Sequence, residues 1–244
     1  MRIALLGYGK MGKAIEAIAL REGDDVVVRL NSSNQATFDY GQLKNCDVAI
    51  EFSRPDRAVH NILRCFEAKV PVVVGTTGWL DRLPEVEAAC IRSEGALLWA
   101  SNFSIGVQLF FALNKKLALL MSRHAAYSDV RIEEIHHVHK LDAPSGTALS
   151  LAGQLLSASE NLKSWKAFPV GSQLPSDSSI LPVFYDRTDD VPGTHKVCYA
   201  SAQDKIEIVH TAFNRDGFAS GALAAAHWLV GRKGVFTMDD FLQL

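Results

Sequence analysis

The sequence predicts an α/β protein that combines a doubly wound parallel sheet with a second, α+β domain whose open sheet is mostly antiparallel or mixed. Up to about residue 104, short apolar segments alternate with amphipathic helical segments, which is typical of parallel strands covered by helices on both faces. A long helical segment follows at residues 105–121, and most later segments have the composition of strands. We therefore expect a first domain of residues 1–104 and 216–244 and a second domain of residues 105–215.

Composition and charge narrow the class of protein. The chain has 244 residues and a net charge of −2, which gives no reason to expect nucleic acid or a membrane surface as a partner. Lys115 and Lys116 interrupt the most apolar segment, so no membrane span is predicted. The cysteines contain no CxxC pair, which favours a reducing compartment, and we expect a cytoplasmic protein. They are Cys46, Cys65, Cys90 and Cys198.

The beginning of the chain carries a glycine motif in a specific structural context. A buried strand is predicted at residues 2–6 and a second strand at residues 25–30, with an amphipathic helix between them. Gly7, Gly9 and Gly12 form the pattern GxGxxG where the first strand meets this helix. In a Rossmann-like domain these glycines allow a tight turn, the approach of a pyrophosphate and close helix packing. The motif predicts dinucleotide binding, and the alternative is a tight turn without a ligand.

Three more buried strands are predicted at residues 47–52, 70–74 and 96–100, with helices at about residues 55–68 and 83–93 between them. Ligands of such sheets bind beyond the carboxyl ends of the strands. The loops at that edge include GTTG and ASNF, since each directly follows a strand. Glycine and asparagine also favour ordinary turns, so these two loops have a purely structural interpretation as well.

The end of the second strand bears on the choice of cofactor. NAD-selective sites usually place an acidic residue there to bind the ribose 2′-hydroxyl. Here the chain reads Arg29, Leu30, Asn31, Ser32 and Ser33, without a carboxylate. We therefore expect NADPH to be used at least as well as NADH.

A second motif lies in the expected second domain. Residues 134–148 read EIHHVHKLDAPSGTA, between a predicted strand at residues 129–135 and a predicted helix at residues 147–156. The first turn of a helix offers unpaired N–H groups and a partial positive charge, and the small residues of PSGT let an anion come close. Lys140 and the histidines add positive charge nearby. The segment therefore predicts a site for a small molecule that carries carboxylates.

Two other interpretations of the histidines stay open. They can be part of a solvated polar loop, or they can bind zinc. His136 and His137 are adjacent on a strand and point to opposite faces, so only His137 and His139 can share a face. A zinc site would need further ligands from elsewhere.

The same segment resembles the signature of the 4-hydroxy-tetrahydrodipicolinate reductase family, formerly called dihydrodipicolinate reductase, and the resemblance extends over the whole chain. It implies NAD(P)H-dependent reduction of 4-hydroxy-tetrahydrodipicolinate, a cyclic dicarboxylate, with loss of water, in lysine and diaminopimelate biosynthesis. It also implies a homotetramer. The family motif assigns proton donation to His136 and Lys140. A histidine ionises near pH 6.5, so His136 is expected to change its protonation in the working range.

The remaining expected contacts follow from the resemblance together with the glycine motif. The expected substrate contacts are His137, Ser145, Gly146, Thr147 and Arg215. The expected cofactor contacts are Gly7, Gly9, Lys10, Met11, Gly12, Arg29, Asn31, Phe52, Gly75, Thr76, Thr77, Ala100, Ser101, Asn102 and Phe103. No metal is expected.

The rest of the second domain is predicted as a loop at residues 157–179, followed by strands at residues 181–185, 194–200 and 205–213. These strands are apolar, and we expect one sheet face without a helix to be an assembly surface. The last helix is predicted at residues 218–230. Another two-domain NAD(P)-dependent dehydrogenase or a non-catalytic nucleotide sensor would share this plan, and turnover of a dicarboxylate would discriminate between them.

Overall fold

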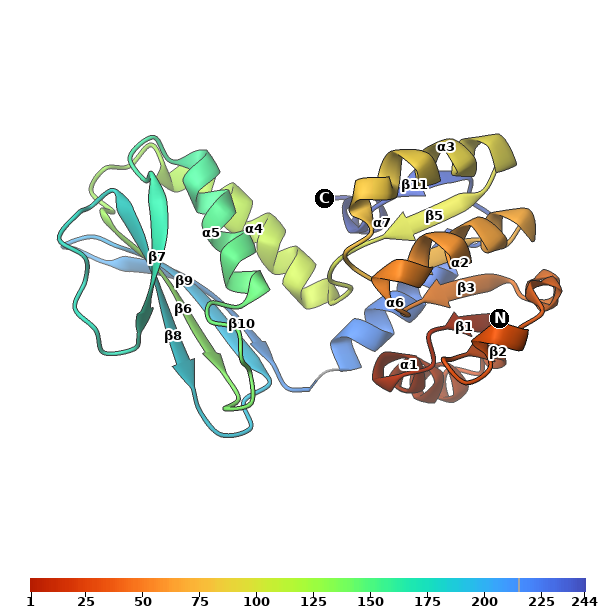
Figure 1. Ribbon diagram of the computed structural model, residues 1–244. Coiled ribbons are helices and arrows are strands. Elements are labelled where there is room, and N and C mark those ends of the chain that lie inside the picture. The colour runs from red at the N-terminus through yellow and green to blue at the C-terminus, as the bar shows by residue number, and fades with distance from the viewer. Residues whose placement is uncertain (215) are drawn as a thin grey trace. The chain divides into compact units, whose positions relative to one another are not determined.

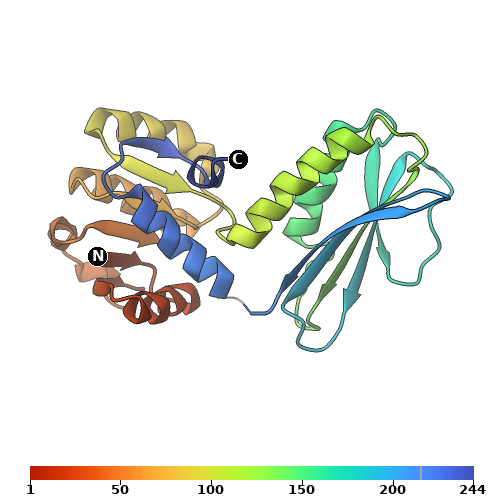
Figure 2. The same ribbon diagram turned by 180° about the vertical axis from the view of Figure 1, so that it is seen from behind.

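The computed structural model describes residues 1–214 and 216–244 (Figure 1). The chain forms two compact units, of which unit 1 comprises Met1–Ile105 with Asp216–Leu244 and unit 2 comprises Gly106–Arg215. Figure 2 shows both units from behind. Among the described residues, no helix is both long enough and apolar enough to cross a membrane.

Unit 1 contains a parallel six-stranded sheet in the order β11-β5-β4-β3-β1-β2. Its strands are β1 (Arg2–Leu6), β2 (Asp25–Leu30), β3 (Val48–Glu51), β4 (Val72–Val74), β5 (Ala96–Trp99) and β11 (Gly234–Phe236). Its helices are α1 (Lys10–Arg21), α2 (Pro55–Glu67), α3 (Leu83–Ser93), α6 (Asp216–Leu229) and α7 (Met238–Leu242), with short 3-10 turns at Gln35–Thr37, Tyr40–Asn45 and Leu80–Arg82. The predicted doubly wound sheet is confirmed, and β11 and α7 are additions that the sequence analysis did not predict.

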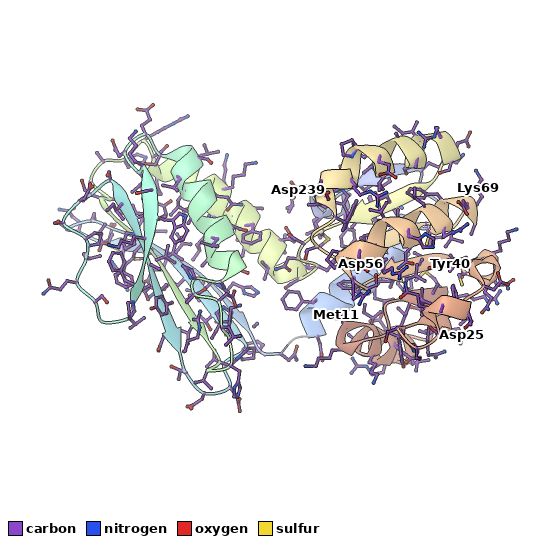
Figure 3. All side chains as sticks on the ribbon, in the orientation of Figure 1. Met11, Asp25, Tyr40, Asp56, Lys69 and Asp239 are labelled. Atoms are coloured by element: carbon purple, nitrogen blue, oxygen red, sulfur yellow. The ribbon has the colours of Figure 1, made fainter. Side chains whose placement is uncertain are left out.

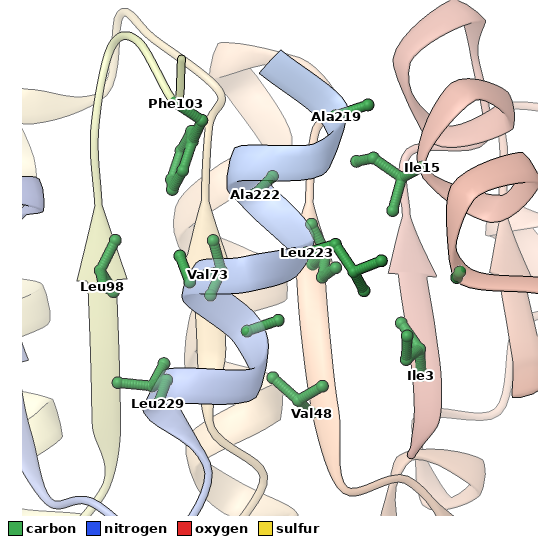
Figure 4. Close-up of a cluster of buried hydrophobic side chains, with 14 of the residues drawn as sticks. Ile3, Ile15, Val48, Val73, Leu98, Phe103, Ala219, Ala222, Leu223 and Leu229 are labelled. Atoms are coloured by element: carbon green, nitrogen blue, oxygen red, sulfur yellow. The ribbon is translucent and has the colours of Figure 1, made fainter. Parts of the chain in front are cut away.

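Helices cover both faces of this sheet. Because side chains alternate along each strand, every strand can contribute to both cores. Ile3 and Leu5 pack in the core beneath α1 and α6, whereas Ala4 and Leu6 pack in the core beneath α2 and α3. Figure 4 shows the first core, where the alanine-rich helix α6 crosses the strands and Leu223 lies among their side chains. Small residues on α6 allow this close approach, since a Cβ at Gly221 would collide with the Phe103 carbonyl.

The strand register brings the loops of unit 1 to one edge. Leu6 is paired with Leu30 on one side and with Glu51 on the other, so β1, β2 and β3 end together. Figure 3 labels Met11 and Asp56 at this edge, in the first turns of α1 and α2. The nucleotide-site residues predicted from distant segments of the chain therefore lie at a common edge.

Unit 2 contains a mixed five-stranded sheet in the order β10-β9-β6-β8-β7, with α4 (Ile105–Met121) and α5 (Gly146–Ala158) on one face (Figures 1 and 2). The strands are β6 (Asp129–His136), β7 (Ser164–Pro169), β8 (Ile180–Arg187), β9 (Gly193–Ala200) and β10 (Lys205–Ala212). The predicted open mixed sheet is confirmed. The predicted loop at residues 157–179 is wrong in part, because β7 forms there by pairing with β8, a tertiary contact that local composition does not reveal.

The face of this sheet opposite α4 and α5 is more polar than expected. Lys196 on β9 pairs with Glu133 on β6 at 2.6 Å and with Glu207 on β10 at 3.5 Å, and Arg131 pairs with Glu133 at 3.1 Å. The expectation of a broad apolar surface here is therefore wrong at the centre of the face. Its apolar side chains include Val209 of β10, which lies opposite Lys196, and Phe184 of β8, whose ring centroid is 5.9 Å from that of Phe168 of β7.

Candidate active site

The turn between β1 and α1 is shaped to receive a phosphate group. Gly7 has a φ of +110°, and a Cβ there would overlap the Phe52 carbonyl. A Cβ at Gly12 would overlap the Gly7 carbonyl, which explains why the third glycine is needed for close packing. Gly9 is the N-cap of α1, its side-chain space is open and no side chain caps the helix. The backbone amides of Lys10 and Met11, in the first turn of α1, are thus open to an anion.

Beside this turn lies a pocket of about 240 Å³ with three walls. The turn contributes Gly7, Tyr8 and Gly9, the end of β2 contributes Leu30, Asn31, Ser32 and Gln35, and the start of α2 contributes Phe52, Ser53, Arg54 and Arg57. This pocket suits the adenosine end of a dinucleotide, since it lies where ribose is read in such folds. Arg54 and Arg57 were not singled out from the sequence, because they come from a different strand end.

Two residues expected to read the ribose have other partners. The side-chain oxygen of Asn31 accepts hydrogen bonds from the Ser33 amide at 2.8 Å, from the Ser33 hydroxyl at 2.6 Å and from the Asn34 amide at 3.2 Å. Asn31 therefore holds its own turn together. The Arg29 guanidinium is ion-paired with Glu16, which also accepts a hydrogen bond from the Tyr8 hydroxyl. Arg54 and Arg57 line the pocket itself, and both pair with the exposed Asp56, at 2.9 Å and 3.6 Å.

The loops after β3 and β4 meet at a buried carboxyl group, that of Glu51. Glu51 at the end of β3 is fully buried, and its Oε1 accepts hydrogen bonds from Ser53 and from the Asn61 amide group. Burial raises the pKa of Glu51. A Cβ at Gly75 would overlap the Phe52 ring, so this loop must carry glycine. The loop GTTG is therefore fixed by packing as well as available for a ligand.

The loop ASNF, which follows β5, contributes fewer side chains to the candidate site than expected. Phe103 is 2% exposed and packs against Phe52, with ring centroids 5.8 Å apart, so its side chain belongs to the core. Asn102 accepts a hydrogen bond from the Ser104 amide at 2.9 Å and so shapes the turn into α4. The segment of Ala100, Ser101 and Asn102 lies at the same sheet edge as the other loops.

In unit 2 the histidine-rich segment folds around Glu134. Its side chain is fully buried and accepts hydrogen bonds from the Ser145 amide at 3.0 Å and from Arg187 Nη2 at 2.9 Å. His195 Nε2 lies 3.6 Å from its Oε2. Burial would raise the pKa of Glu134, but the hydrogen bonds from His195, Ser145 and Arg187 outweigh burial and lower this pKa to about 2. Glu134 is therefore an anion that anchors β6, β8 and the start of α5.

His136 lies two residues further along β6, on the same face as Glu134. Its Nδ1 is 3.1 Å from the Pro192 carbonyl oxygen, and its Nε2 is 3.2 Å from His195 Nε2. Burial and the neighbouring His195 lower the pKa of His136 to about 4. The expectation that His136 changes its protonation near neutral pH is therefore wrong for the unliganded protein, in which the ring is neutral at pH 7.

Lys140 is held by an acidic neighbour. Its Nζ lies 2.8 Å and 2.9 Å from the two carboxylate oxygens of Asp142, and this contact lowers the pKa of Asp142. Asp142 is 58% exposed, so an incoming carboxylate can replace it. Arg187 holds the loop in shape, since its guanidinium donates to the carbonyl oxygens of Lys140 at 3.4 Å and Asp142 at 2.5 Å.

The start of α5 carries the predicted anion site. Ser145 is its N-cap, and the Ser145 hydroxyl accepts a hydrogen bond from the Ala148 amide at 3.2 Å. Within the described part of the chain, no hydrogen bond is recorded for the amides of Gly146 and Thr147, which lie in the first turn. A Cβ at Gly146 would meet no atom within 4 Å, so the approach is open. These two amides can bind a carboxylate.

The other predicted residues are placed as follows. His137 and His139 lie beyond the end of β6, with ring centroids 6.3 Å apart. The side chains that cluster are instead Glu134, His136 and His195. Because Arg187 and the Ser145 amide already bind Glu134, we interpret this group as a hydrogen-bonded cluster and not as a zinc site. Arg215 lies outside the described residues.

Sequence reasoning did not assign a role to Glu134, Arg187 or His195. Two of them had a signal in the sequence. Glu134 and His136 are two residues apart on a predicted strand and so share a face, and His195 follows Pro192 and Gly193 just before a strand. Arg187 could not have been found in this way, because only the parallel pairing of β8 with β6 brings it to Glu134.

Comparison with known proteins gives full-length matches. The family model for the N-terminus of dihydrodipicolinate reductase matches residues 1–103, and the model for the C-terminus matches residues 106–242. A protein of Christiangramia forsetii named 4-hydroxy-tetrahydrodipicolinate reductase is 47% identical over 244 residues, which cover 99% of this chain and 98% of the relative. A protein of Akkermansia muciniphila with the same name is 36% identical over 241 residues, covering 97% and 95%.

A solved structure has the same fold. It is described as a dipicolinate-bound dihydrodipicolinate reductase from Paenisporosarcina sp. TG-14. The TM-score is 0.75 at 21% sequence identity, and the alignment covers 97% of each chain.

Proposed function

The chain belongs to the dihydrodipicolinate reductase family, and on this basis we propose that it is an NAD(P)H-dependent 4-hydroxy-tetrahydrodipicolinate reductase of lysine and diaminopimelate biosynthesis. The enzyme would reduce (2S,4S)-4-hydroxy-2,3,4,5-tetrahydrodipicolinate to tetrahydrodipicolinate with loss of water. The observation that carries the proposal is the 47% identity to a reductase of that name over 99% of the chain. The anion-binding features of unit 2 suit a dicarboxylate substrate.

The residues of unit 1 fit a nicotinamide dinucleotide. The amides of Lys10 and Met11 would bind the pyrophosphate, since Gly9 leaves the start of α1 open. The pocket with Ser32, Arg54 and Arg57 would hold the adenosine ribose. When bound, the reduced cofactor supplies the hydride. The two arginines and the lack of a carboxylate at the end of β2 support the use of NADPH.

The residues of unit 2 would bind the substrate through its carboxylates. The amides of Gly146 and Thr147, in the first turn of α5, would hold one carboxylate. Glu134 does not repel it strongly, because Arg187 and the Ser145 amide neutralise that buried charge. His137 and Arg215 remain the proposed contacts for the second carboxylate.

Lys140 and His136 would supply the positive charge and the proton that the product ring requires. A bound dicarboxylate would replace Asp142 on Lys140 and leave that ammonium group in contact with the reacting ring. Negative charge near His136 would also raise the pKa of this histidine from about 4, which favours uptake of a proton on binding. Both groups act where negative charge develops in the transition state.

A coupled assay tests this assignment. The substrate is generated by the preceding aldolase, and oxidation of NADPH and NADH is followed by the loss of absorbance. Wild-type protein should turn over the dicarboxylate, and Lys140→Ala should lower the turnover number by about 10²–10⁴-fold. Thr147→Val should mainly raise the Michaelis constant, because it changes the first turn of α5.

The matched control is Lys163→Ala, which removes a lysine of unit 2 whose ammonium group donates to the nearby Glu160 carbonyl. NADPH binding, followed by fluorescence, should be unchanged in the Lys140 and Lys163 variants. A folded Lys140→Ala protein with wild-type turnover would contradict the proposed role of this segment. Absence of any turnover in the wild type would contradict the proposed function itself.

Two further properties belong to the same proposal. We propose a cytoplasmic enzyme, which the four buried cysteines support because all of them are free thiols. We also propose a homotetramer that assembles through the sheet of unit 2. The supporting observation is that α4 and α5 cover only one face of this sheet.

A further inference from the structure

We propose that His195 is a positioning residue for the proton donor His136, because its N–H occupies Nε2, the ring nitrogen of His136 that the Pro192 carbonyl leaves unprotonated. It also connects His136 with the start of α5. The importance of His136 for turnover rests on the proposed function, whereas the proton arrangement rests on the geometry of unit 2 alone.

The ring of His136 has little freedom. Its Nδ1 faces the Pro192 carbonyl at 3.1 Å, and because a carbonyl oxygen only accepts, Nδ1 carries a proton. Gly193 packs against the ring, since a Cβ there would lie 2.7 Å from its Cε1. In the neutral ring Nε2 must then be an acceptor. This nitrogen points at His195.

His195 supplies the matching donor. Its Nε2 lies 3.2 Å from His136 Nε2 and 3.0 Å from the Ser145 hydroxyl. Two unprotonated nitrogens at this distance would repel each other, so His195 carries its proton on Nε2. Its Nδ1 is buried without a hydrogen-bond partner among the described residues. An N–H there would be unsatisfied, which favours the same tautomer.

The N–H of His195 has three possible acceptors, namely His136 Nε2, the Ser145 hydroxyl and, at 3.6 Å, Glu134 Oε2, and this choice gives it a function. When it donates to His136, it keeps His136 Nε2 occupied and the ring neutral. When it donates to the Ser145 hydroxyl instead, Nε2 of His136 becomes free to take up a proton. His195 thereby couples the state of the proton donor to the N-cap of the helix that would bind the substrate carboxylate.

The charged and titratable groups around His136 and His195 come from β6, β8 and β10 and from the loop that follows β6. Glu134 of β6 has an Oε2 3.6 Å from His195 and 3.8 Å from His136, and it favours a cationic ring. Arg187 of β8 neutralises Glu134, and Lys140 opposes a second positive charge at His136. On β10, His210 is the cross-strand neighbour of His195. This balance leaves the His136 ring neutral in the unliganded protein.

Two substitutions at one position test the proposal. His195→Leu removes the donor, whereas His195→Gln places an amide N–H near the original Nε2 but cannot titrate. We expect His195→Leu to lower the turnover number by about 10–100-fold with little change in the Michaelis constant. This is less than the full contribution of a proton donor, because His136 itself stays in place. His195→Gln should restore most of the turnover.

Nitrogen-15 NMR of the imidazoles provides a readout that needs no substrate. Wild-type His136 should show the Nδ1–H tautomer with a hydrogen-bonded Nε2 at pH 7, and His195→Gln should retain both features. In His195→Leu the Nε2 resonance should move to the position of a nitrogen that accepts no hydrogen bond. In His195→Gln the titration of His136 should also shift to higher pH, because the neighbouring imidazole no longer lowers its pKa. His124→Gln, at an exposed position after α4, is the matched control and should change neither readout.

The outcomes separate the alternatives. A folded His195→Leu protein with wild-type turnover and an unchanged His136 Nε2 resonance overturns the proposal. Equal losses of turnover in His195→Leu and His195→Gln with the wild-type Nε2 resonance in both also overturn it, since they indicate a structural role only. If the wild type fails to reduce the dicarboxylate, the proposed function fails, and the NMR comparison still decides the role of His195.

Discussion

Two fully buried glutamates show how a cationic partner changes the pKa of a buried carboxyl group. Glu134 binds Arg187 and the Ser145 amide, and its pKa is lowered to about 2. Glu51 has hydroxyl and amide partners but no cation, and burial raises its pKa. A buried carboxylate persists as an anion only where a positive partner offsets the loss of hydration. Glu134 is therefore suited to organise charge, whereas burial favours the protonated form of Glu51.

The lowered pKa of His136 predicts a pH-dependent contribution to stability. The unfolded chain takes up this proton near pH 6.5 and the folded chain only near pH 4, so protons favour unfolding between these values. Relative to His136→Gln, the wild type should thus lose free energy of unfolding as the pH falls from about 6.5 to about 4. Thermal unfolding of both proteins across this range is the measurement. Parallel curves would show that His136 is not held neutral by the fold.

The position of Asn31 predicts a change of cofactor preference. An aspartate there could accept the same three hydrogen bonds from Ser33 and Asn34, so Asn31→Asp should fold normally. The new negative charge lies in the pocket and should repel a 2′-phosphate. We expect the ratio of catalytic efficiencies, NADPH over NADH, to fall by about tenfold, which corresponds to about 1.4 kcal/mol. An unchanged ratio would place the 2′-phosphate elsewhere.

Arg57 gives a complementary prediction on the opposite wall of this pocket. Arg57→Ala should weaken the binding of NADPH more than the binding of NADH, because only NADPH carries the 2′-phosphate. Arg64→Ala is the matched control, since Arg64 lies on the same helix and pairs with Glu67. Fluorescence titration with both cofactors measures the effect. Equal weakening for both cofactors would argue against a role in recognising the phosphate.

At the scale of elements, the two proposed sites lie at strand-to-helix junctions. The turn from β1 to α1 leaves helix amides open, because its glycines carry no side chains. The connection from β6 to α5 does the same, with Ser145 as N-cap and the amides of Gly146 and Thr147 beyond it. Both junctions rely on the partial positive charge at a helix N-terminus.

Two glycine-to-alanine substitutions test this view with opposite expectations. Gly7→Ala requires φ near +110° and overlaps the Phe52 carbonyl, so it should destabilise unit 1 by at least about 1–3 kcal/mol and abolish NADPH binding. Gly153→Ala lies inside α5 with open space around it and should stabilise the protein by up to about 1 kcal/mol. Denaturant unfolding and cofactor titration report both effects. A Gly7→Ala protein that binds NADPH normally would contradict the role of the turn.

At the scale of the whole molecule, assembly is the property to measure. The uncovered sheet face of unit 2 combines the ion pairs around Lys196 with the stacked rings of Phe168 and Phe184. Such a face can bury apolar rings while its charges pair across an interface. We expect a homotetramer in sedimentation equilibrium, and Phe168→Asp should shift it toward smaller species. A wild-type monomer at all concentrations would rule out the proposed assembly.

The sequence alone determined much of this protein. Alternating apolar segments and the glycine motif predicted the parallel sheet, and the motif from Glu134 to Ala148 indicated the anion site, because local patterns encode strands, helix starts and turns. Only the tertiary structure brought Arg187 and His195 to Glu134, and it assigned Arg29 and Asn31 to partners of their own. It also formed β7, which requires β8 as a partner. These features depend on pairings between distant strands, and such pairings are settled by packing and register and not by local composition.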